Sequence, residues 1–121
     1  MEKKQPGSLG KLAEDFVAQR LAEEGCKIFG RNYRTRLGEI DIIAQKDGWI
    51  LFVEVKARKA GSMVSPLEAV TRSKQKKLLL AAGQYLAENP APWQPRFDVA
   101  AVYMQAERIV KMEYLENAFT A

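Results

Sequence analysis

Residues Gly38–Arg58 read GEIDIIAQKDGWILFVEVKAR, in which two runs rich in isoleucine, valine and phenylalanine flank Asp47-Gly48. Such runs are typical of strands, and Asp-Gly between them predicts a two-residue hairpin turn. The runs also carry Asp41, Glu54 and Lys56. Charged groups on a sheet that packs apolar side chains cost free energy unless they are paired or bind a ligand. This stretch therefore predicts a functional site as well as a fold.

The turn also predicts how the two strands pair. Counting outward from it gives four cross-strand pairs: Lys46 with Trp49, Ile43 with Phe52, Asp41 with Glu54, and Glu39 with Lys56. Because side chains alternate between the faces of a strand, the three charged residues share one face. The other face then carries Ile40, Ile42, Val53 and Val55. Opposed carboxylates repel, which favours a bound cation between them or neutralisation by Lys56, and a loop one residue longer would break this register.

Composition excludes several kinds of site. The chain of 121 residues contains no His and one Cys, Cys26, so a zinc site of nitrogen and sulfur ligands, a Ser-His-Asp triad and a Cys-His pair are all excluded. Any metal must be held by oxygen atoms, which selects Mg²⁺ or Mn²⁺. Cys26 opens a predicted strand, where a buried, unreactive thiol is expected.

Length and hydropathy predict one domain, residues 9–121, after a flexible polar segment, residues 1–8. The sequence has no apolar run of membrane-spanning length and does not begin with the apolar stretch of a signal peptide. We therefore expect a cytoplasmic protein without a membrane partner.

Periodicity predicts two helices and five strands. A first helix, capped by Ser8 and ended by Gly25, has an apolar face formed by Leu9, Leu12, Ala13, Phe16 and Val17. A second lies within residues 66–88, where Leu78, Leu79, Ala82, Tyr85 and Leu86 form the apolar face, and a proline-rich segment ends it. Strands are expected at residues 27–34, 40–45, 49–57, 97–104 and 109–115, with a loop at 59–65. The order α-β-β-β-α-β-β predicts an α/β sheet with helices on both faces.

Basic residues gather in three segments, residues 27–36, 56–59 and 72–77, which hold eleven of the nineteen Lys and Arg and none of the fifteen Asp and Glu. If folding brings these segments together, they form a face for a polyanion; otherwise they are three solvated surfaces. Tyr33, Arg34 and Arg36 favour nucleic acid, because they offer stacking and phosphate donors.

Both helices can direct polar side chains at the sheet. Glu14 lies at the edge of the first helix's apolar arc, whereas Asp15 points to solvent. An ordinary boundary glutamate explains Glu14 as well as a role at the site does. Lys74 and Gln75 precede Leu78 and Leu79 by four residues, so they share the inward face of the second helix.

Taken together, an Asp, a turn and Glu-x-Lys on adjacent strands after a helix with an inward Glu resemble the PD-(D/E)XK nuclease superfamily. More closely, the chain resembles the YraN family of predicted endonucleases, which are similar to archaeal Holliday-junction resolvases. The matching stretches are GKLAEDFVAQRLAEEG, RNYRTRLGEIDIIAQKDG, LFVEVKAR, RFDVAAV and LENAF. The resemblance covers nearly the whole chain from Leu9 onward and implies a restriction-endonuclease-like core with a mixed five-stranded sheet. The superfamily's proline before the aspartate is replaced by Ile40, which removes no ligand.

The resemblance also implies roles. Asp41 and Glu54 match the metal-binding acids, Lys56 the catalytic lysine and Glu14 the helix glutamate of the resolvase-like branch, while the Val55 carbonyl completes the shell of Mg²⁺ or Mn²⁺. Among the basic and polar residues we expect Arg34, Arg36, Arg58, Lys74 and Gln75 to bind nucleic acid. The implied function is endonucleolytic hydrolysis of structured or branched DNA, with DNA ahead of RNA. The alternative is a non-catalytic nucleic-acid-binding or adaptor domain, and whether two subunits act together as a homodimer stays open.

Overall fold

The computed structural model describes residues 7–120, with side chains from Leu9 onward. Its elements are α1 (Gly7–Glu23), β1 (Lys27–Arg34), β2 (Glu39–Lys46), β3 (Trp49–Lys59), α2 (Arg72–Glu88), β4 (Gln94–Gln105) and β5 (Arg108–Phe119). The predicted order of helices and strands is confirmed. Helix α1 already begins at Gly7, so Ser8 lies within it instead of before it. Most of the predicted flexible segment, residues 1–6, and any cap there lie outside the described residues.

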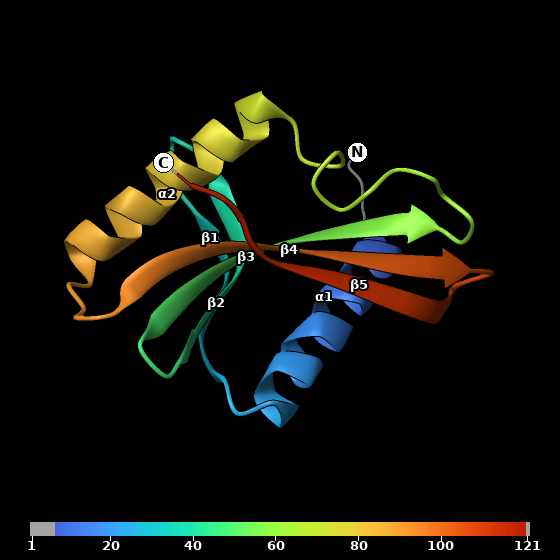
Figure 1. Cartoon of the computed structure of the whole chain (residues 1–121), viewed down its shortest axis with the longest axis horizontal. Coiled ribbons are helices and arrows are strands. Elements are labelled where there is room, and N and C mark those ends of the chain that lie inside the picture. The colour runs from blue at the N-terminus through green and yellow to red at the C-terminus, as the bar shows by residue number, and fades with distance from the viewer. Residues whose placement is uncertain (1–6, 121) are drawn as a thin grey trace.

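One sheet with strand order β1-β2-β3-β4-β5 forms the centre of the fold. Neighbouring strands are antiparallel except β3 and β4, which run parallel and are joined through α2. A parallel pair needs such a crossover, because the first strand ends at one end of the sheet and the second strand begins at the other end. Helix α1 covers one face and α2 the other (Figure 1). The prediction of a mixed five-stranded α/β sheet is confirmed, and the arrangement is compatible with a restriction-endonuclease-like core.

The core has a layer on each side of the sheet. On the α1 side it is built from Ala13, Val17, Ala18, Leu21, Cys26, Ile42, Ala44, Leu51, Val53, Ala100, Val102 and Met104. On the α2 side it is built from Ile40, Ile43, Ile50, Phe52, Val70, Leu78, Ala81, Ala82, Phe97 and Val99. The predicted inward face of α1 was wrong for Leu9 and Leu12, which are exposed, since the buried stripe begins one turn later. Within residues 7–120, none of the helices is long and apolar enough to cross a membrane.

The hairpin register is confirmed from the turn out to the pair Ile42–Val53. The predicted pairs of Asp41 with Glu54 and of Glu39 with Lys56 were wrong, because β2 and β3 separate beyond that point. If the ladder continued, the Val55 N–H would donate to a backbone carbonyl of β2. It donates instead to Asp41 Oδ2, at 2.8 Å. A side chain therefore replaces the backbone acceptor where the two strands part.

Residues on β2 change face at the same place. Ile42 packs on the α1 side, but Ile40 packs under α2, so the prediction that both share one face was wrong. Across the β1–β2 ladder, Asn32 has φ = 54°, between the regular pairs of Arg31 with Ile42 and Tyr33 with Ile40. This local irregularity interrupts the alternation at Asp41.

A close approach fixes α2 against the turn between β1 and β2. A Cβ placed on Gly38 would lie 2.8 Å from the backbone oxygen of Lys77 in α2. The turn itself is held by Thr35, whose Oγ accepts from the amides of Leu37 and Gly38 at 2.9 and 3.1 Å. Glycine at residue 38 thus lets the first half of α2 approach the strand that carries Asp41.

Candidate functional site

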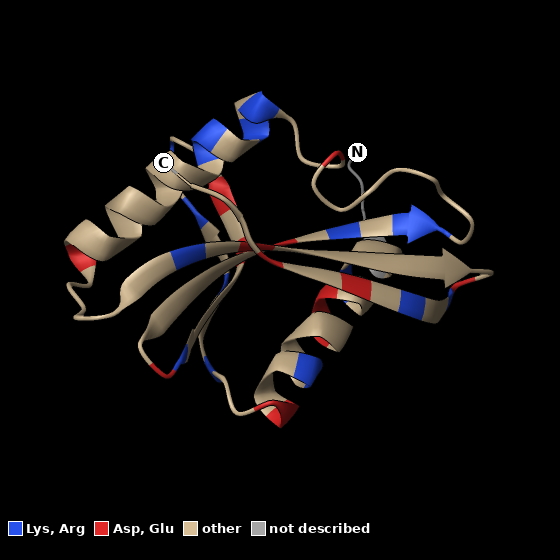
Figure 2. Cartoon of the chain, viewed as in Figure 1, with Lys and Arg blue, Asp and Glu red and all other residues tan. Residues whose placement is uncertain are grey.

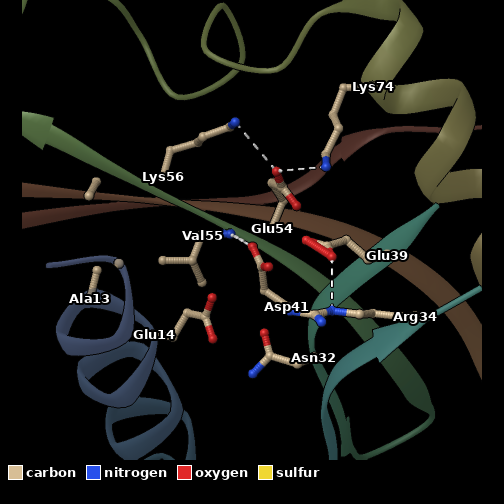
Figure 3. Close-up of a pocket in the computed structure, with 12 residues that line it drawn as sticks. Ala13, Glu14, Asn32, Arg34, Glu39, Asp41, Glu54, Val55, Lys56 and Lys74 are labelled. Carbon is tan, nitrogen blue, oxygen red and sulfur yellow. Dashed lines mark hydrogen bonds and ion pairs between the residues drawn. The ribbon is translucent and has the colours of Figure 1, made fainter. Parts of the chain in front are cut away.

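A cavity of about 600 Å³ lies where β2 and β3 separate. Because the sheet is interrupted there, side chains from both faces reach it: Figure 3 shows Glu14 on α1 and Lys74 on α2 on either side of Asp41 and Glu54. Its lining is Gly10, Ala13, Glu14, Asn32, Arg34, Glu39, Asp41, Glu54, Val55, Lys56, Ala57 and Lys74. Seven of the ten predicted site residues belong to this set: Glu14, Arg34, Asp41, Glu54, Val55, Lys56 and Lys74.

Two buried carboxylates form the floor of the cavity. Asp41 and Glu54 are 8% and 4% exposed. Burial raises the pKa of both groups, and the neighbouring Glu54 raises the pKa of Asp41 further, against the lowering effect of the Val55 amide. A pair of this kind favours a shared proton or a cation over two unshielded negative charges.

The two oxygens of Glu54 have different surroundings. Oε2 lies 3.6 Å from Lys56 Nζ and 3.8 Å from Lys74 Nζ. Oε1 is buried and has no hydrogen-bond partner among the described residues. A buried carboxylate oxygen without a partner is costly, so its lone pairs are available to a ligand.

A third buried carboxylate shows the contrasting case. Asp98, 1% exposed, accepts hydrogen bonds from Arg96 Nε and Nη2 at 3.0 and 2.9 Å, from the Tyr114 hydroxyl at 2.7 Å and from the Asn117 amide at 2.9 Å. Both of its oxygens are satisfied, and they tie β4 to β5. Asp98 therefore has a structural role, whereas Glu54 has acceptor capacity left over.

Glu14 enters the cavity from α1, as predicted. Burial and the charge of Asp41 raise its pKa, while the Asn32 amide and Arg31 lower it. Arg31 Nη2 lies 3.7 Å from Glu14 and 2.7 Å from Asp15, which is half-exposed on the solvent side of the helix, as predicted. Sequence reasoning missed Asn32. The available signal was an asparagine in a strand, because asparagine tolerates the left-handed backbone that it adopts here.

The donor set fits a hard divalent cation. Asp41 and Glu54 supply carboxylate oxygens, as Mg²⁺ and Mn²⁺ prefer. In a β-strand, the N–H and the C=O of one residue point toward the same neighbouring strand. The Val55 carbonyl therefore faces the gap between β3 and β2, as the Val55 N–H does. In residues 7–120 no three acidic or cysteine side chains converge into a metal cluster. A metal would thus need this carbonyl and water or substrate oxygens beside the two acids.

Three predicted nucleic-acid contacts lie outside the cavity. Arg36 is exposed in the turn before Gly38. Arg58 is half-buried and lines a separate groove beside Leu9. Gln75 Nε2 donates to the Val70 carbonyl at 3.0 Å, which directs it back toward its own loop. Gln75 is therefore occupied by a local contact.

Two further expectations on β1 and β2 need correction. Tyr33 does not offer its ring for stacking, because it packs edge-on against Tyr85 and its hydroxyl donates to Glu88 at 2.8 Å. Glu39 pairs with Arg34 at 3.3 Å instead of with Lys56. Arg34 is largely exposed and lines the cavity beside Glu39.

The three basic segments do converge at the cavity. Each contributes one basic residue to the lining: Arg34, Lys56 and Lys74. Figure 2 shows further Lys and Arg over the first turns of α2 and at the end of β3. Helix α2 begins after Thr71, whose hydroxyl accepts from the Lys74 amide at 3.1 Å, and its first turn has no acidic residue. The positive end of the helix dipole adds to these charges.

Comparison with known proteins identifies the family. The profile of "Uncharacterised protein family UPF0102" matches residues 13–102. UPF0102 proteins of Rhodococcus opacus (strain B4) and Alkaliphilus metalliredigens (strain QYMF) are 41% and 45% identical to the chain, over 93% of it and over 96% and 97% of the relatives. The UPF0102 protein TTE1452 of Caldanaerobacter subterraneus subsp. tengcongensis is 38% identical over 98% of the chain and its own whole length. The chain belongs to the UPF0102 family.

Proposed function

We propose that this UPF0102 protein is a divalent-metal-dependent nuclease that hydrolyses phosphodiester bonds of nucleic acid, with structured or branched DNA ahead of RNA. The resemblance of Gly38–Arg58 to the YraN family and the PD-(D/E)XK superfamily supports this proposal. So does the position of Asp41, Glu54 and Lys56 in one cavity between α1 and α2.

One observation carries the proposal: Glu54 is buried beside Asp41, in a cavity that also holds lysines, and one of its oxygens has no hydrogen-bond partner within residues 7–120. A binding module gains nothing from buried carboxylates that repel DNA. A hydrolase needs them, because Mg²⁺ or Mn²⁺ held there acidifies water and polarises a phosphoryl oxygen.

The remaining side chains have distinct tasks in this scheme. Lys56 orients the attacking water and stabilises negative charge on the phosphate in the transition state. Arg34 and Lys74 bind the phosphate backbone at the cavity, which gives affinity without sequence information. Glu14, across the cavity from Glu54, accepts hydrogen bonds from water near the reacting phosphate.

The test is cleavage of a panel of branched, flapped, nicked, duplex and single-stranded substrates, DNA and RNA, with Mn²⁺, Mg²⁺ or EDTA. Wild type should cleave at least one DNA substrate with metal and none in EDTA. Asp41→Asn and Glu54→Gln should abolish cleavage, and they should also lose the metal-induced rise in melting temperature that binding to the folded state produces. Asp47→Asn, an acid in the hairpin turn and outside the cavity, is the matched control.

DNA binding without cleavage by wild type, on every substrate and with each metal, would instead support the adaptor function. If the metal-induced rise in melting temperature is unchanged in both Asp41→Asn and Glu54→Gln, the metal does not bind at these two carboxylates.

A further inference from the structure

Two lysines from different elements converge on one oxygen of Glu54. Lys56 is on β3, the same strand as Glu54, and Lys74 is in the first turn of α2. Both ammonium groups lie within 4 Å of Oε2, at 3.6 and 3.8 Å. The lysine side chains are 33% and 30% exposed and that of Glu54 5% exposed. The lysines thus stand between the carboxylate and solvent.

A divalent cation that uses Glu54 must compete with these lysines. Each ammonium carries a positive charge within a few ångströms of the carboxylate, where the effective dielectric constant is lower than in water. The pairs therefore stabilise the carboxylate without metal, and the same charges repel an arriving cation. Oε1 has no hydrogen-bond partner in the described part of the chain, so the lysines satisfy only one of the two carboxylate oxygens.

A phosphate group shifts this balance. Ammonium groups that are partly exposed can turn toward a phosphate at the mouth of the cavity, since lysine is flexible and carries three donors. Each lysine that turns toward the phosphate no longer competes with the metal for Glu54. The phosphate also adds negative charge near the metal.

We propose that Lys56 and Lys74 occupy Glu54 in place of a divalent cation until a phosphodiester draws them away, so that metal and nucleic acid bind this site cooperatively. This inference rests on the proposed nuclease function. Its consequence is that the free protein binds metal weakly and that the substrate itself completes the metal site. By linkage, the metal strengthens nucleic-acid binding by the same factor.

Lys74 is the residue to test, because Lys56 has its own catalytic assignment. Ca²⁺ is titrated calorimetrically into wild type, Lys74→Met, Lys74→Arg and Lys76→Met, each with and without a saturating duplex oligonucleotide. Ca²⁺ serves as a hard cation, and the oligonucleotide alone is titrated as a blank. Lys76→Met is the matched control, since Lys76 is exposed in the same helix and outside the cavity.

DNA should tighten Ca²⁺ binding to wild type by roughly 5- to 100-fold, as allosteric coupling typically does. Lys74→Met should bind Ca²⁺ about three- to tenfold more tightly than Lys76→Met without DNA, because one competing charge is gone, and it should show less tightening with DNA. Lys74→Arg, which keeps the charge, should resemble wild type.

The inference is overturned if Ca²⁺ binds wild type equally well with and without DNA, or if Lys74→Met and Lys76→Met bind it alike. In both cases a metal still binds and the proposed function stands. Absence of Ca²⁺ binding to wild type under both conditions would overturn the metal site and the inference together. Melting temperatures of all variants exclude misfolding as the cause.

Discussion

Asp41 has two opposing effects on stability. It accepts a hydrogen bond from the Val55 amide, which stabilises the fold, and it buries a carboxylate among apolar side chains, which costs free energy. Burial and Glu54 raise its pKa from 3.8 to about 7. Between these two values the folded protein keeps a proton that the unfolded chain has released. The unfolding free energy therefore falls as pH rises from about 4 to about 7.

Asp41→Asn should remove this pH dependence, because asparagine cannot ionise and its carbonyl can still accept from Val55. In EDTA we expect the variant to be more stable than wild type at pH 8, by about 2 kcal/mol, with a smaller gain at pH 5. Thermal unfolding of both proteins at the two pH values measures this. A stability difference that is equal at pH 5 and pH 8 would contradict the pKa shift.

Substitution of Lys56 distinguishes a nuclease from a non-catalytic adaptor. Lys56→Ala should lower the cleavage rate in Mn²⁺ by about two to three orders of magnitude, as loss of one preorganised charged group does, while DNA affinity in Ca²⁺ changes little. If Lys56 only neutralises Glu54, melting temperature should fall in parallel with activity. Cleavage at the wild-type rate would show that Lys56 is not the catalytic lysine.

At the scale of elements, Gly38 sets how closely α2 approaches the site. Gly38→Ala would force the Cβ against the Lys77 backbone, so we expect a loss of about 1–3 kcal/mol of stability and reduced activity from a displaced Lys74. Gly83→Ala, within α2 itself, is the control. Its Cβ would meet no atom of the described residues within 4 Å, and alanine should stabilise α2 by about 0.5–1 kcal/mol. Chemical denaturation of the three proteins gives both differences.

The elements themselves followed from periodicity and turn chemistry, because their signals are local. The Asp47-Gly48 turn predicted the register correctly as far as Ile42–Val53. Strand ends were less predictable: β4 begins at Gln94 and includes Pro95, a residue that disfavours strands but here pairs with Ile50.

The candidate site depends on contacts that no local signal reports. Glu14, Lys56 and Lys74 could be placed on inward faces from periodicity, and all three line the cavity. The separation of β2 from β3 could not be predicted, since it depends on Asp41 taking the Val55 amide. For the same reason Ile40 was assigned to the wrong face and Asn32 was missed.

At the scale of the whole molecule, the bases of three separate segments surround one cavity. Binding of DNA should release counterions and so weaken steeply with salt, and replacing Arg36 or Lys74 by Ala should reduce the slope of log affinity against log salt by up to about one unit each. Lys46→Ala, at the opposite end of β2 from the site, should leave the slope unchanged. Affinities measured across a salt series test this, and salt-insensitive binding would contradict a basic binding face.

The bond from Val55 to Asp41 makes one backbone amide a reporter for the entire cavity. Its nitrogen resonance in an NMR spectrum depends on the charge of the carboxylate it contacts, so it should shift as Asp41 takes up a proton or engages a cation. The amides of Val53 and Ile42, held in the regular ladder, should move far less. A single peak can then distinguish the free, protonated and metal-bound states without any cleavage assay. If the Val55 peak stays fixed while metal binds, the ion lies elsewhere on the protein.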